Sequence, residues 1–146
     1  MQSITIGRPS SYLRLTAVRH PPDSAPEHLP RQRRRYLQAE LHLSDVSATC
    51  KLDLNDHYAG LDIFFQQVAA HWHEWENTRM VWGMHGGLRL DFERVRGAFH
   101  EPEYLILWIK LGTVGFRRRP WFVETSMIIE ADELESIADN LRLLSD

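Results

Sequence analysis

The residue types that most often carry chemistry are few here, and their spacing does not favour catalysis. His71 and His73, which precede Glu74, are two residues apart in a segment of helical periodicity. They therefore lie about 200° apart around the helix and cannot share a metal ion. Cys50 stands on the apolar side of an alternating run, where a buried thiol is inert. No serine lies in a G-x-S-x-G turn, and no glycine-rich phosphate-binding motif occurs. We therefore expect no catalytic residue, metal or cofactor.

Two arginine clusters are the most concentrated charges in the chain. Arg117, Arg118 and Arg119 are consecutive, and four further arginines lie within residues 31–35. Such a cluster binds phosphate or an acidic protein surface. It also occurs at solvated turns, where it discourages edge-to-edge pairing of sheets. The sequence leaves both interpretations open.

An almost wholly apolar strand, predicted over residues 104–111, offers a second kind of site. Tyr104, Ile106 and Trp108 share one face of this strand, and the alternating leucines and isoleucine share the other. If helices cover only one side, the other face needs a second copy, a partner protein or the loop at residues 20–35. Because Trp, Tyr and Arg are enriched at binding hot spots, we expect the aromatic face, rimmed by the arginines at 117–119, to bind a partner. The alternative is a small second core closed by the 20–35 loop.

Hydrophobic periodicity predicts the elements that must position these residues. Alternating residues predict strands over 12–18, 37–43, 46–54, 88–93, 104–111 and 121–130, whereas spacings of three and four predict helices over 58–76 and 134–144. Each helix has one apolar face, with Trp72 and Trp75 placed in the core. The simplest packing is an α+β fold, a largely antiparallel β-sheet with two amphipathic helices on one face. We expect a single domain over residues 1–146 with a proline- and arginine-rich loop at 20–35, and we see no internal repeat.

Composition limits the classes of function. The chain has 146 residues, a net charge of −3 at pH 7 and one cysteine. This acidic balance argues against general nucleic-acid binding. No run approaches the ~18 apolar residues of a membrane span, and no secretory signal is visible, so we expect a cytoplasmic protein without a membrane partner. Glu133 and Asp139 lie off the apolar stripe of the last helix and are expected to face a protein partner; a homodimer is also possible.

A tryptophan-rich motif surrounds the end of the first predicted helix. Trp72, Trp75 and Arg79 stand in a W-x-x-W-x-x-x-R spacing, after a G-L-D-x-F-F run that begins at Gly60. With the last helix, this motif resembles a family of small bacterial α+β domains of unknown function, over roughly residues 58–144. The resemblance implies a cytoplasmic bacterial protein but no activity. From its position just beyond the helix, Arg79 is expected to hydrogen-bond the last helical carbonyls and to stack on an indole.

Three functions from different classes remain. The first is a non-enzymatic protein-binding domain, most concretely an immunity-type inhibitor of a bacterial toxin, which rests on fold-level analogy. The second is a small-molecule binder or enzyme that uses a cleft between the sheet and the 20–35 loop. Its candidate residues share the outer face of the predicted hairpin: Glu40, His42, Lys51 and Asp53. The third is a structural homodimer.

Overall fold

The fold consists of two four-stranded antiparallel sheets and two helices. The computed structural model describes residues 3–19, 35–53, 60–75, 79–83, 87–95, 104–113 and 120–145. Sheet A contains β1 (Ser3–Arg8), β2 (Ser11–Arg19), β3 (Arg35–His42) and β4 (Ser47–Asp53) in that order. Sheet B contains β5 (Arg79–Trp82), β6 (Leu88–Val95), β7 (Tyr104–Thr113) and β8 (Trp121–Ile129) in that order. The helices are α1 (Leu61–His71), which continues into a 3-10 helix at Trp72–Glu74, and α2 (Ala131–Ser145).

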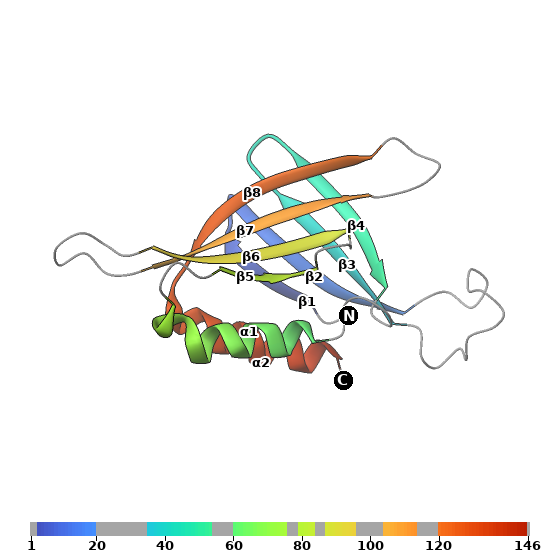
Figure 1. The fold of residues 1–146 in the computed structure, drawn as a ribbon. Helices are drawn as coiled ribbons and strands as arrows, with labels where there is room; N and C mark the ends of the chain where they lie inside the picture. Colours follow the sequence, from blue (N-terminus) through green and yellow to red (C-terminus); the bar gives the residue numbers. More distant parts are fainter. Residues whose placement is uncertain are drawn as a thin grey trace.

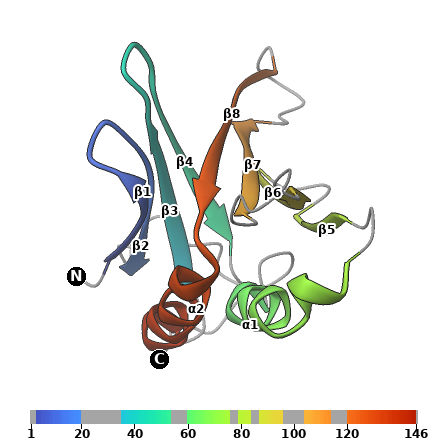
Figure 2. The same cartoon turned by 90° about the vertical axis from the view of Figure 1, so that its left-hand side faces the viewer.

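The two sheets face each other, and their strands cross at a steep angle (Figure 1). The two helices lie side by side beneath them and close one end of the space between the sheets (Figure 2). Each sheet is followed in the chain by one helix, so the order of four strands and a helix occurs twice. Each helix contacts the sheet of the other half: α1 contacts β5, and α2 contacts β1 and β2. This repeat of topology is not visible in the sequence.

The core lies between the inner faces of the sheets and extends onto the helices. Alternate residues of β2, β3, β6 and β7 are fully or almost fully buried, as their period-2 pattern predicts. On α1, Phe65 is fully buried and its ring meets the edge of Phe92 from β6 at a centroid distance of 5.5 Å. The sheets come close where β4 meets β7, beside Gly87: a Cβ on Gly87 would lie 2.9 Å from the Gly112 backbone oxygen and 3.0 Å from Cys50 Sγ. Only glycine fits at this contact.

The α+β fold with antiparallel pairing is confirmed, but the sequence underestimated the number of sheets. The strands form two sheets rather than one, and β1 and β5 were not predicted. β5 has only four residues, too few for a clear alternation. The expectation that both helices lie on one face of a single sheet is not confirmed. Within the described residues, neither helix has the length and apolar character that crossing a membrane requires.

The first helix ends differently from the prediction. It ends at His71 and tightens into a 3-10 turn, after which Trp75 has an extended backbone. This change of rotation per residue leaves Trp72 partly buried and Trp75 buried. The residue that closes the helix end is Arg94 of β6, not Arg79. Arg94 Nη1 donates hydrogen bonds to the carbonyl oxygens of His73 and Trp75, both at 2.8 Å, and its guanidinium lies 5.5 Å from the Trp72 ring centroid.

Candidate functional site

The outer face of sheet B carries the site with the most developed geometry. In the described part of the chain no helix or strand covers this face, which is turned toward the viewer in Figure 1. A hollow of about 280 Å³ opens on it, which we call the Trp108 hollow. It is lined by Arg79, Arg89, Asp91, Trp108, Lys110 and Glu124. Antiparallel register brings these residues together from four strands, since Asp91 of β6 lies opposite Trp108 of β7 and Lys110 lies opposite Glu124 of β8.

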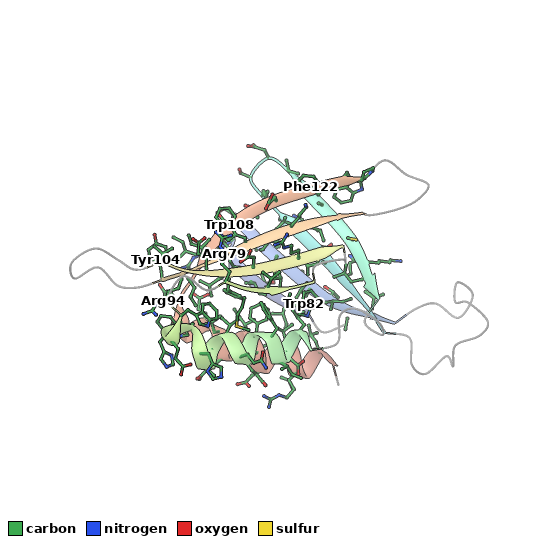
Figure 3. The ribbon with its side chains drawn as sticks, in the orientation of Figure 1. Arg79, Trp82, Arg94, Tyr104, Trp108 and Phe122 are labelled. Atoms are coloured by element: carbon green, nitrogen blue, oxygen red, sulfur yellow. The ribbon has the colours of Figure 1, made fainter. Side chains whose placement is uncertain are left out.

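A shared acceptor fixes two sides of the hollow. Glu93 Oε2 accepts a hydrogen bond of 2.9 Å from Arg79 Nη2 and one of 3.0 Å from Trp108 Nε1. The hydrogen bond to Glu93 therefore holds the indole ring in place. Trp108 and Arg79 are labelled on this face in Figure 3. Because both donors depend on one carboxylate, the orientation of Trp108 is coupled to the β5–β6 pairing that places Arg79. The hollow is thus preorganised by bonds that the isolated chain already makes.

Asp91 is the buried polar residue of this site. Its side chain is 11% exposed, and its Oδ2 lies 3.6 Å from Arg79 Nη1 and 3.9 Å from Arg89 Nη2. Its Oδ1 is buried and has no hydrogen-bond partner among the residues that the structure describes. Burial raises the pKa of this carboxyl above its ordinary value, and the two arginines offset the rise only in part. A buried acceptor without a partner costs stability.

This pKa shift makes a prediction for stability. Since the pKa of Asp91 is higher in the folded chain than in the unfolded chain, the folded state keeps a proton over a range where the unfolded state has lost it. Stability is then lost as pH rises above the ordinary carboxyl range. We expect Asp91→Asn to remove this loss, so that the variant gains stability relative to the wild type as pH rises from 4 to 7. Urea unfolding at several pH values measures the difference in free energy of unfolding between the wild type and Asp91→Asn. Asp45→Asn, at an exposed position, is the control. A difference that does not change with pH would contradict the prediction.

The structure brings together some of the sequence-predicted interface residues. Tyr104, Ile106 and Trp108 share the outer face of sheet B, all partly buried, while the alternating residues of β7 are fully buried. Arg117, Arg118 and Arg119, expected at the rim, lie outside the described residues.

The acidic candidates of α2 lie elsewhere. Glu133 Oε1 is 3.9 Å from Arg8 Nη2, and the exposed Asp139 pairs with Arg142 at 3.7 Å. Because α2 packs against β1 and β2, the structure does not place Glu133 and Asp139 beside the Trp108 hollow. Glu133 and Asp139 remain predicted contacts with a protein partner, in a region separate from the Trp108 hollow.

The alternative site on the outer face of the β3–β4 hairpin does not bring His42 and Asp53 together. His42 lies opposite Ser47 and Tyr36 opposite Asp53, so His42 and Asp53 stand at opposite ends of the hairpin. At about 3.4 Å per residue this separates them by roughly 20 Å. Residues 20–34 of the loop that was to close this cleft lie outside the described residues, and Arg35 begins β3. Burial raises the pKa of the Cys50 thiol, whose Sγ lies 3.5 Å from the Gly112 oxygen, so it is not an activated nucleophile.

Sequence reasoning missed the charged residues that line the hollow. Arg89, Asp91 and Glu93 alternate with buried residues of β6, which marks them as one face but not as neighbours of Trp108. Arg79 was assigned to a helix end because β5 was not predicted. The signal in the sequence was that residues 88–93 and 104–111 both alternate with period 2, as strands do. Asp91 and Trp108 become neighbours only once the register between these two strands is known.

The site shows no centre for metal chemistry, and comparisons identify no relative. Within the described ranges, no three His, Cys, Asp or Glu side chains are grouped so that they could hold a metal ion. No family model, curated protein or solved structure matches this chain. The resemblance carried by Trp72, Trp75 and Arg79 therefore stays a prediction, and the function rests on the geometry alone.

Proposed function

We propose that this chain is a protein-binding domain without catalytic activity of its own, and that it binds its partner through the outer face of sheet B. The observation that carries the proposal is the Trp108 hollow, where an indole held by its hydrogen bond to Glu93 stands among charged side chains of both signs. Tryptophan and arginine are the residue types that dominate binding energy at protein interfaces.

The size and charge of the hollow favour a protein side chain as its occupant. Its volume of about 280 Å³ lies just below the ~300–1,000 Å³ of pockets that enclose small ligands. Its lining carries three basic and two acidic residues, so it complements a polar group rather than a strongly charged ligand. The exposed Val81 flanks it on the same face and would contact the surrounding partner surface.

Removing the anchor tests this proposal. We expect Trp108→Ala to raise the dissociation rate of the partner by about thirtyfold, because a hot-spot residue contributes about 2 kcal/mol or more. The partner is first isolated with the immobilised wild-type chain and identified by mass spectrometry, and the purified pair is then measured by surface plasmon resonance. The association rate should change little, since buried contacts act mainly on dissociation.

A matched aromatic on the other sheet supplies the control. Tyr12 lies on the outer face of sheet A, stacked on His42 at a centroid distance of 4.7 Å. Tyr12→Ala should leave the captured partner and its dissociation rate unchanged. Equal binding of the wild type and of Trp108→Ala, with unchanged melting curves, would refute the sheet B interface.

The more specific form of this function is an immunity-type inhibitor of a bacterial toxin, which acts in the cytoplasm. The first turn of α2 carries Asp132 and Glu133, and Asp139 is exposed further along, so this helix would steer a basic toxin toward the chain. Charge reversal at Glu133 and Asp139 should slow association at low salt and leave dissociation unchanged. A partner without toxic activity, or one whose toxicity the chain does not suppress, would exclude this form but not the protein-binding function.

A further inference from the structure

We propose that two copies of this chain associate by pairing their β8 strands antiparallel about a two-fold axis at Thr125. β8 has nine residues and is an edge strand, hydrogen-bonded only to β7 within the described part of the chain. An edge strand offers unpaired N–H and C=O groups, which proteins usually protect by short length, proline or charge. β8 contains no proline, and Glu124 is its single charged residue. It forms the upper rim of sheet B in Figure 1.

Two exposed apolar side chains on β8 indicate that its free edge takes a further strand. Phe122 is 60% exposed and Ile128 is 57% exposed, and both belong to the outer row of β8 (Phe122 is labelled in Figure 3). They stand three residues before and three residues after Thr125. In an antiparallel pair centred on Thr125, each Phe122 lies directly opposite Ile128 of the second copy, on the same face of the sheet. Association would remove both apolar side chains from water.

Charge selects this register over its neighbours. Centring on Thr125 places Glu124 opposite Ser126 of the second copy and pairs the whole strand. An axis at Glu124 would bring two glutamates face to face, which is destabilising. An axis at Ser126 would place Glu124 against Ile128 of the second copy and leave Phe122 beyond the end of the partner strand. The Thr125 register alone matches apolar with apolar and leaves the carboxylate unopposed.

The proposed dimer joins the two copies of sheet B into one sheet of eight strands. Because the two-fold axis stands perpendicular to the sheet, both outer faces point the same way, and the two Trp108 hollows lie on one continuous surface. The inference is independent of the proposed function, since it concerns only contacts of the chain with itself. It is tested on the purified full chain without any partner.

Light scattering after size-exclusion chromatography, over a range of concentrations, tests the association. We expect a concentration-dependent dimer for the wild type, weakened roughly tenfold or more by Phe122→Glu and by Ile128→Lys. Both positions are exposed, so both variants should fold, which melting curves verify. Ile63→Lys is the matched control, because Ile63 is 53% exposed but lies on α1, and its dimer should equal that of the wild type.

The double variant Phe122→Glu/Ile128→Lys tests the register. It places opposite charges directly across the proposed pair, so the association that each single variant weakens should be restored. A cross-link gives a second measurement: Thr125→Cys in a Cys50→Ala background brings its Cα atoms to about 4.5–5.5 Å, within reach of a disulfide. Val123→Cys in the same background places them roughly 13 Å apart and should not cross-link.

Three results would overturn the proposal. A wild-type chain that stays monomeric up to its solubility limit excludes it. So does a dimer that neither single variant weakens, because that dimer uses another surface. A double variant that remains monomeric while Val123→Cys cross-links as readily as Thr125→Cys excludes the register.

Discussion

Phe65→Ala is expected to lower the free energy of unfolding by about 3–5 kcal/mol, the range for removing a buried aromatic ring. Phe65 is fully buried on α1, and its ring makes edge contacts with Phe64 at 5.7 Å and with Phe92 at 5.5 Å between centroids. The substitution opens a cavity where α1 meets sheet B. Loss of this size is a large part of the stability of a small protein. Denaturant unfolding followed by tryptophan fluorescence measures it.

The neighbouring residue Ile63 provides the control for this effect. Ile63 is 53% exposed on the same helix, so Ile63→Ala should change the free energy of unfolding by no more than about 0.5 kcal/mol. A similar loss of free energy of unfolding in the two variants would show that α1 turns a different face toward the core. The sequence pattern placed Trp72 at the centre of the buried face. Because Trp72 is only partly buried, Trp72→Ala should cost less than Phe65→Ala.

Arg94→Ala is expected to lower the free energy of unfolding by about 2–4 kcal/mol, because it removes two hydrogen bonds from a charged donor and a cation–π contact. The guanidinium joins the carbonyl oxygens of His73 and Trp75 to β6, so it fixes the end of α1 to sheet B. Without it, His73 and Trp75 lose this link to β6. Denaturant unfolding gives the loss, and hydrogen exchange at the last turn of α1 should rise with it.

Arg94→Lys separates geometry from charge. A lysine keeps the positive charge but not the fork of donors, so it should recover only a small part of the loss. Arg89→Ala is the control on the same strand, since Arg89 is exposed on the outer face and its Nη2 lies 3.9 Å from Asp91 Oδ2. It should cost about 0–1 kcal/mol. Full stability in Arg94→Lys would contradict the role of the two carbonyl bonds.

The local periodicity of apolar residues by itself determined much of the secondary structure of this protein. Alternation along residues 37–43 and 104–111 identified β3 and β7 and their buried faces, because side chains of a strand point to opposite sides regardless of the fold around them. The apolar arc around residues 61–68 identified α1 for the equivalent reason. The same alternation put Trp108 with Tyr104 and Ile106 on one face before any pairing was known.

Tertiary structure decided which strands belong together, and with it the site. Period 2 marks a face but does not say which strand is the neighbour, so the sequence did not separate two sheets from one or reveal that each helix packs against the other half. The partners of Trp108 depend on register: Asp91 lies opposite it, and Arg79 joins through β5, a strand too short to show alternation. The helix-closing role expected of Arg79 fell to Arg94, because contacts between residues distant in the chain follow from packing, which local periodicity does not contain.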